Sequence, residues 1–154
     1  MTRVLVAGVG NLFFSDDAFG VEVARRLTGV PASDVKVADF GIRAVHLAYE
    51  LLEPWQLCVV ADCMPRGGKP GTLYVIEPDV TGVDASVANA HALDLPTVFA
   101  AVRELGGRLP RTLVVGCEPD VVQPGIGLSP SIAAAIPAAI QLIRSLISTE
   151  ETPP

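Results

Sequence analysis

The sequence predicts a single-domain α/β three-layer sandwich, in which helices cover both faces of a mostly parallel, open sheet. Strand-like apolar runs alternate with helix-like stretches along the chain, a pattern typical of parallel strands joined by crossover helices. Half of the residues are hydrophobic and the mean hydropathy is +0.47, which favours strands buried on both faces. The 154 residues match one domain of ordinary size. We expect residues 1–148 to form this domain and residues 149–154 to form a flexible tail.

Each element is predicted from its own local pattern. Apolar runs ended by glycine, proline or a charged residue predict the strands, which are expected at residues 3–8, 35–39, 57–61, 71–76 and 112–116. The fourth of these is expected to be an added antiparallel or edge strand. Amphipathic stretches predict helices at residues 16–27, 44–52, 92–105 and 129–148. Ser129 and Pro130 favour the start of the last helix, and Pro137 predicts a kink in it.

Charge and cysteine content exclude several classes of protein. The net charge is −6 and the 11 basic residues are dispersed, which argues against nucleic-acid binding. Three cysteines without a CxxC pair favour a reducing compartment, and no signal-peptide pattern is present, so a cytoplasmic location is expected. Pro137, Gln141 and Arg144 interrupt the longest apolar stretch, 132–147. This stretch is shorter than the roughly 20 residues that span a bilayer, so we expect no membrane span.

The loop after the first strand begins like a dinucleotide-binding motif. In a GxGxxG motif that starts at Gly8, the third glycine would stand at Phe13, and the loop is too long for the tight turn that seats a pyrophosphate. We therefore do not expect NAD or FAD binding.

Two adjacent acids, Asp16 and Asp17, stand where the first helix should begin. Helix capping explains one of them, but Ser15 can already act as the cap, which leaves one acid for another role. Gly20 in the first turn costs roughly 1 kcal/mol relative to alanine and indicates a close backbone approach. From these residues alone, both capping and a functional site remain open.

Two further residues extend the candidate site. Asp62 follows an apolar strand at its carboxyl end, where α/β proteins place their sites, although a turn role explains it equally well. His91 precedes a predicted helix, and alone it is more simply a hydrogen-bonded loop residue; His46 is expected inside a helix. Together, Asp17, Asp62 and His91 supply three ligands and leave open positions, as in catalytic divalent-metal sites. A bound cation would also offset the repulsion between the carboxylates.

The same residues resemble one known family, the hydrogenase maturation endopeptidases. Residues 4–20 are similar to the family's GxGNxxxxD(D/E)xxG opening, and residues 59–63 are similar to its second acidic strand end. His91 matches the family's metal-binding histidine. Residues 116–120 and 127–130 resemble its closing GxxP…GLS/TP segment. The resemblance covers nearly the whole chain in the same order.

The resemblance implies an endopeptidase of the aspartic or metal-dependent type. Asp17, Asp62 and His91 would bind nickel, which is expected to be carried by the substrate; another divalent metal is an alternative. The implied partner is a [NiFe]-hydrogenase large-subunit precursor, from which a short C-terminal extension is removed. Asp39 would orient the attacking water or relay a proton. Cys63 and Cys117 have no evident histidine partner in the sequence, so a cysteine-peptidase mechanism is not expected.

The chain departs from the family in the second loop, and two other functions stay open. Members often carry an Asp-Gly-Gly-Thr-like segment where this chain has residues 39–43, Asp-Phe-Gly-Ile-Arg, which bears on substrate choice. Asp17 also stands where some relatives have glutamate. A non-cleaving protein that checks nickel loading would need the same ligands. A metallohydrolase of a small molecule is the other alternative.

Overall fold

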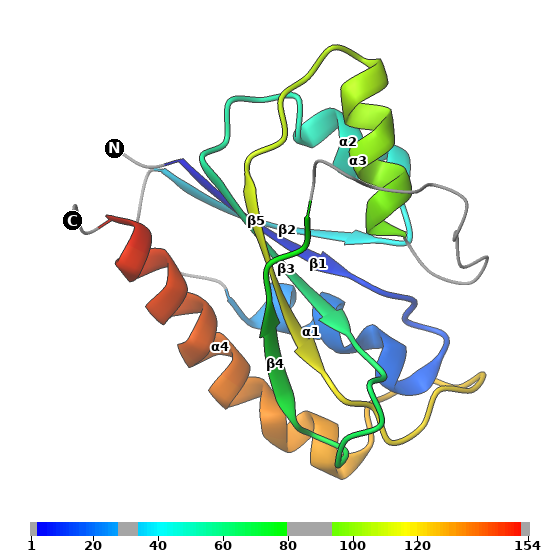
Figure 1. Ribbon diagram of the computed structural model, residues 1–154. Coiled ribbons are helices and arrows are strands. Elements are labelled where there is room, and N and C mark those ends of the chain that lie inside the picture. The colour runs from blue at the N-terminus through cyan, green and yellow to red at the C-terminus, as the bar shows by residue number, and fades with distance from the viewer. Residues whose placement is uncertain (1–2, 28–33, 80–93, 152–154) are drawn as a thin grey trace.

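A five-stranded sheet with helices on both faces forms the protein (Figure 1). The computed structural model describes residues 3–27, 34–79 and 94–151. The strands are β1 (Val4–Val9), β2 (Val35–Gly41), β3 (Leu57–Cys63), β4 (Leu73–Ile76) and β5 (Arg111–Cys117). The helices are the 3₁₀ turn η1 (Ser15–Ala18), α1 (Phe19–Arg26), α2 (Ala44–Glu50), α3 (Leu95–Glu104) and α4 (Pro130–Glu151). The predicted fold class is confirmed.

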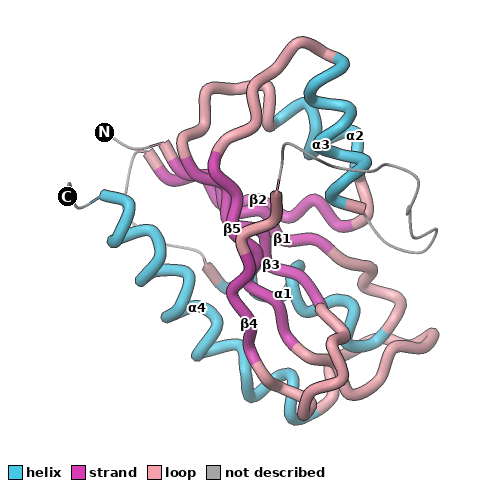
Figure 2. Tube along the Cα trace, viewed as in Figure 1, coloured by secondary structure: helices cyan, strands magenta, loops and turns pink. Residues whose placement is uncertain are grey.

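The strand order is β2-β1-β3-β5-β4, and Figure 2 draws these strands in magenta. The first four strands in this order run parallel. The predicted fourth strand, β4, lies at the edge and pairs antiparallel with β5. The loops that follow β1, β2, β3 and β5 therefore meet at one edge of the sheet, where open α/β sheets bind ligands.

Two hydrophobic cores lie on opposite faces of the sheet. Because successive strand residues point to opposite faces, Val59 and Ala61 pack with α1 and α4, whereas Cys58 and Val60 pack with α2 and α3. The central strand β1 is buried along its whole length, as its unbroken apolar sequence predicts.

Helix α4 is longer than the sequence indicated. It continues past Ser148 to Glu151, so residues 149–151 are helical rather than part of a tail. Arg111 pairs with Glu150, and the Thr149 hydroxyl donates to the Ser145 carbonyl at 3.0 Å, which ties the last turn down.

By length and composition, α4 is a weak candidate for a membrane-crossing helix. One face of it packs in the core as in a helix that covers a sheet; that face comprises Ile132, Ile136, Ala139, Ile143 and Ile147. Their spacing of three or four residues is that of an amphipathic core helix.

Three predicted boundaries shift in ways that affect the site. The first helix opens with η1 before α1 begins at Phe19, and β3 extends two residues further than predicted, to Cys63. Asp62 thus lies within the strand instead of after it. Helix α3 begins at Leu95, so Pro96 stands in its first turn, where proline is tolerated.

Candidate active site

Asp17 is placed by the loop between β1 and α1. The chain leaves β1 through Gly10, which has a φ of +139°. A Cβ on Gly10 would lie 1.9 Å from the carbonyl oxygen of Asp17, so this turn requires glycine. The Asn11 N–H donates to Asp17 Oδ2 at 2.8 Å, and the Phe13 N–H donates to Asn11 Oδ1 at 2.9 Å. Asp17 is therefore held by its own loop, not by capping of a helix.

Asp62 reaches the same edge from the neighbouring strand. β1 and β3 pair in register up to Gly8 and Ala61, and Asp62 follows directly. Helix α1 approaches both strands closely through Gly20, because a Cβ there would lie 1.9 Å from the Ala61 carbonyl oxygen and 2.4 Å from that of Val9. The sequence-based inference of a close backbone approach at Gly20 is confirmed.

The two acids influence each other electrostatically. Burial raises the pKa of the Asp62 carboxyl well above its ordinary value, and the nearby Asp17 carboxylate raises it further, against the Cys63 N–H, which lowers it. Burial also raises the pKa of Asp17, opposed by the Asn11 N–H. Two carboxyls that share one partly dehydrated site favour retention of a proton or binding of a cation.

Asp16 has different partners from this pair. Its side chain is fully buried and accepts hydrogen bonds from the backbone N–H groups of Asp120, Val121 and Ser129 and from the Ser129 hydroxyl. Burial raises its pKa, but these hydrogen bonds together lower it below the ordinary value. The capping interpretation is wrong for Asp16: it holds the loop that precedes α4. The Ser129 hydroxyl, expected to cap α4, donates to Asp16 Oδ2 at 2.8 Å.

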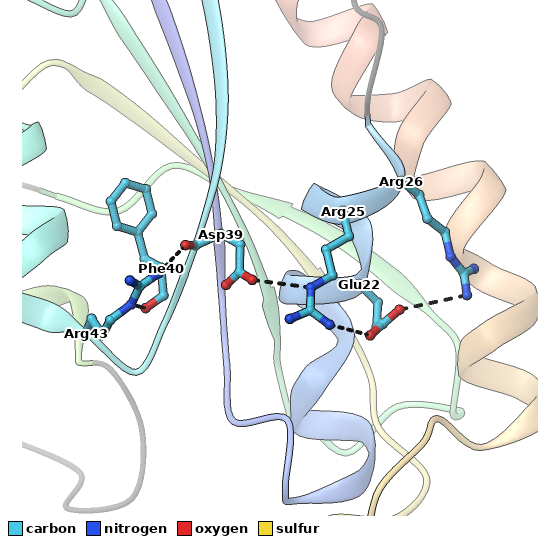
Figure 3. A network of polar contacts seen from close by, with 6 residues as sticks. All are labelled: Glu22, Arg25, Arg26, Asp39, Phe40 and Arg43. Carbon is cyan, nitrogen blue, oxygen red and sulfur yellow. Dashed lines mark hydrogen bonds and ion pairs between the residues drawn. The ribbon is translucent and has the colours of Figure 1, made fainter.

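Asp39 lies at the end of the edge strand β2, beyond β1 from Asp62. Its carboxylate pairs with Arg25 Nε at 3.4 Å, and its backbone carbonyl accepts from Arg43 Nη2 at 2.6 Å. Figure 3 shows that Arg25 also faces Glu22, which Arg26 approaches from the other side. The contacts shown for Asp39 thus join β2 to α1 and to the following loop.

His91 lies outside the described residues, so its predicted place as the third ligand stays a prediction. Within residues 3–27, 34–79 and 94–151, no group of three His, Cys, Asp or Glu side chains is arranged to hold a metal ion. The part of the site that can be described is therefore the pair Asp17 and Asp62.

Comparison with known proteins decides the family. A family model described as hydrogenase maturation protease matches residues 21–146. The chain belongs to the hydrogenase maturation protease family. This confirms the resemblance inferred from the motifs.

Individual relatives cover almost the whole chain. The hydrogenase 2 maturation protease of Escherichia coli K12 is 27% identical over 148 residues, 94% of this chain and 90% of the relative. Coenzyme F420 hydrogenase subunit delta of Methanothermobacter thermautotrophicus is 33% identical over 159 residues, 97% of each chain. Among solved structures, the E. coli hydrogenase maturating endopeptidase HybD superposes with a TM-score of 0.82 at 26% identity, covering 97% of this chain and 94% of that one.

Glu118 is a buried acid that the sequence reasoning missed. It is 5% exposed, and its Oε1 accepts from the Arg66 N–H, the Gly68 N–H and the Tyr74 hydroxyl, each at 2.8 Å. Burial raises the pKa of Glu118, but these hydrogen bonds lower it below its ordinary value. The contacts fix the loop that follows Asp62. The signal available in the sequence was an acid directly after the buried strand β5.

Cys63 and Cys117 are neighbours in register on β3 and β5. Burial raises the pKa of Cys117 to about 11 and also raises that of Cys63. Thiolates are therefore scarce at neutral pH, which supports the expectation that neither thiol is an activated nucleophile.

Two clefts lie on the surface beside β2 and beside α1. The larger, about 540 Å³, includes Asp39 and Arg43 at the β2 side of the sheet. The other, about 390 Å³, lies beside α1 and is largely apolar, with Phe13 and the 84% exposed Ile126 among its lining residues. Exposed apolar side chains next to a candidate protease site favour contact with a protein substrate.

Proposed function

We propose that this protein is a nickel-dependent endopeptidase that removes a C-terminal extension from a [NiFe]-hydrogenase large-subunit precursor. The observation that carries the proposal is the pair Asp17 and Asp62, two partly buried carboxyls at the edge of the sheet where open α/β folds bind ligands. Burial and the charge of Asp17 raise the pKa of Asp62 there. A related solved structure, 26% identical with a TM-score of 0.78, is a [NiFe] hydrogenase maturation protease from Thermococcus kodakarensis.

Asp17, Asp62 and His91 would hold the nickel ion that the precursor brings. Their chemistry fits a divalent cation, because two carboxylates and an imidazole suit a borderline metal and leave positions for substrate or water. The Asp17–Asp62 pair supports this role, since a cation would relieve the interaction that raises the pKa of Asp62. Another divalent metal is the alternative.

The bound metal would polarise the scissile carbonyl and favour ionisation of a water molecule. Asp39 orients this water or accepts its proton, at the end of β2. Its ion pair with Arg25 and its backbone contact with Arg43 hold it there. The reaction is of the aspartic or metal-dependent type, and the thiols of Cys63 and Cys117 take no part in it. Three free cysteines favour the cytoplasm as its location.

The test is co-expression with the large-subunit precursor, followed by mass spectrometry of the precursor. Wild-type protein should shorten its C-terminus, whereas Asp17→Ala, Asp62→Ala and His91→Ala should leave it intact. Precursor made without nickel should also stay uncut. His46→Ala is the matched control, because His46 is the other histidine and is exposed on α2, and it should cut normally. Full cleavage by any of the three alanine variants removes that residue from the proposal.

A non-cleaving role in checking nickel loading is the second candidate. One observation favours it: the relative that is 33% identical is named as a subunit of a hydrogenase, not as a protease. In the same experiment, an uncut precursor that co-purifies with wild-type protein in a nickel-dependent manner would support this role and contradict the peptidase.

A further inference from the structure

We propose that Asp16 is a positioning residue of this site, which acts through the loop at residues 120–129 to hold Asp17 in place against Asp62. The inference rests on the proposed peptidase function and deepens it, because it adds the loop before α4 to the machinery of the reaction.

The Asp16 carboxylate joins two parts of the chain that are far apart in sequence. Oδ1 accepts from the Ser129 N–H at 2.7 Å, and Oδ2 accepts from the Val121 N–H at 2.7 Å, the Ser129 hydroxyl at 2.8 Å and the Asp120 N–H at 3.0 Å. Hydrogen bonds to an ionised acceptor are stronger than neutral ones, and here four of them converge on one fully buried group. The loop is thereby fixed to the residue next to Asp17.

Ser15 and Asp16 also donate hydrogen bonds to backbone carbonyls of the loop. The Asp16 N–H donates to the Val121 carbonyl at 3.0 Å, and the Ser15 N–H donates to the Gly125 carbonyl at 3.0 Å. The Ser15 hydroxyl donates to the Gln123 carbonyl at 2.9 Å. The loop therefore holds both the backbone and the side chains of Ser15 and Asp16.

These contacts maintain an unfavourable backbone conformation at Ser15. Among the residues that the structure describes, Ser15 alone combines a side chain with a positive φ, 52°. Such a conformation costs free energy and persists where the surroundings fix it. It turns the chain so that Asp16 faces the loop while Asp17 accepts from the Asn11 N–H.

Asp17 is thus held from both sides. On one side, Gly10 lies so close that a Cβ on it would be 1.9 Å from the Asp17 carbonyl oxygen. On the other side, the preceding residue, Asp16, is anchored by its hydrogen bonds to the loop. Release of Asp16 would let η1 rotate and move the Asp17 carboxylate away from Asp62. A displacement of about 1 Å in a reacting group can cost on the order of 100-fold in rate, without a change in the surface that binds substrate.

The experiment measures cleavage kinetics with nickel-loaded precursor. Asp16→Asn keeps the size of the side chain but places an NH₂ group against N–H donors. We expect its kcat to fall by about 10- to 100-fold, with KM within about twofold of wild type. Ser129→Ala removes one hydrogen bond and should lower kcat less, whereas Ser129→Thr, which keeps the hydroxyl, should retain it.

A matched control distinguishes a positioning role of Asp16 from a general loss of stability. Ile143→Val weakens the α4 core, where Ile143 is fully buried, without contact to the site. Urea unfolding gives the stability of each variant, and rates are compared per folded molecule. If Asp16→Asn loses no more kcat than Ile143→Val, or if Ser129→Ala and Ser129→Thr lose kcat equally, the inference is overturned.

A crystal structure of the Asp16→Asn variant tests the inference even if wild-type protein cuts no precursor. Failure of wild-type cleavage would overturn the proposed function. An Asp17 carboxylate that keeps its wild-type place beside Asp62 in the variant would instead overturn the positioning role. If Asp16→Asn does not fold, the Ser129→Ala and Ser129→Thr pair supplies the same comparison.

Discussion

Gly20 lies against the carbonyl oxygen of Ala61, at a separation that leaves no room for a Cβ atom. Gly20 is three residues after Asp17, and Ala61 is the residue before Asp62. The contact therefore sets how closely the segments that carry the two acids approach each other. The atoms that a Cβ on Gly20 would meet belong to the backbone, so a change of side-chain rotamer would not make room for it.

Replacement of Gly20 by alanine should destabilise the fold severely. The added methyl group would meet backbone oxygens 1.9 and 2.4 Å away, so α1 must move, and we expect a loss of about 3 kcal/mol. Urea unfolding followed by circular dichroism measures it. Gly67→Ala is the control: its Cβ meets nothing within 4 Å, and the φ of +82° alone should cost about 1 kcal/mol. Equal losses in the two variants would contradict the close-contact explanation.

Asp62→Asn should stabilise the metal-free protein at neutral pH. Because burial and Asp17 raise the folded-state pKa of Asp62, the folded protein keeps this proton to a higher pH than the unfolded chain does. Stability is then lost as the pH rises from about 4 through the folded-state pKa, and asparagine does not titrate. We expect a gain of roughly 1 kcal/mol at pH 7 that disappears below about pH 4. Urea titrations in the presence of a chelator measure it, and a gain independent of pH would contradict the assignment.

Asp16→Asn should show the opposite pH dependence. Hydrogen bonds lower the folded-state pKa of Asp16, so its carboxylate stabilises the fold above the unfolded-state pKa of about 4. That contribution is lost as the pH falls through the folded-state pKa. The variant should therefore be most destabilised near pH 7 and approach wild type in acid. The same chelated urea titrations apply, and a deficit that grows toward acid pH would refute this reading.

The ion pair between Arg25 and Asp39 should contribute little to stability. Both side chains are partly exposed, and pairs of this kind are worth about 0.2–1 kcal/mol. A double-mutant cycle of Arg25→Met and Asp39→Asn measures the coupling free energy. In contrast, Asp39→Asn should strongly lower precursor cleavage. A coupling well above 1 kcal/mol, with cleavage intact, would assign Asp39 to the fold instead of the reaction.

The Tyr74 phenol should titrate at lower pH once Glu118 is neutral. Its hydrogen bond to the Glu118 carboxylate raises the pKa of Tyr74, and burial and the negative charge of Glu118 raise it further. In Glu118→Gln the charge is gone, so ionisation should shift downward, as followed by ultraviolet absorbance of tyrosinate. Tyr49→Phe, made in both backgrounds, removes the signal of the other tyrosine. An unchanged Tyr74 titration would show that the contact does not persist in solution.

Sequence patterns predicted the fold well because they reflect local chemistry. Short apolar runs such as residues 57–61 are typical of buried strands, and their alternation with helices favours a parallel sheet. The ends of elements were predicted less accurately: residues 149–151 are helical, and Arg111, distant in the chain, pairs with Glu150 in this last turn. A single-sequence pattern does not contain that contact.

The candidate site was predicted in part. Asp17 and Asp62 lie close enough to interact, as expected, because Asp17 follows β1 and Asp62 lies near the end of β3, the adjacent parallel strand. The different roles of Asp16 and Asp17 were not predictable, because they depend on a loop more than 100 residues away. Glu118 was missed for the same reason: its partners, Gly68 and Tyr74, lie on a loop and an edge strand 44–50 residues earlier.

The hydrogen bonds between Asp16 and residues 120–129 also determine when the site can form during synthesis of the chain. They span 104 to 113 residues, so the turn that carries Asp17 lacks its contacts with residues 120–129 until most of the polypeptide has left the ribosome. Contacts this distant in sequence close late in folding. A nascent or truncated chain that ends before residue 120 would therefore lack these contacts to Asp16, and with them one of the two supports of Asp17.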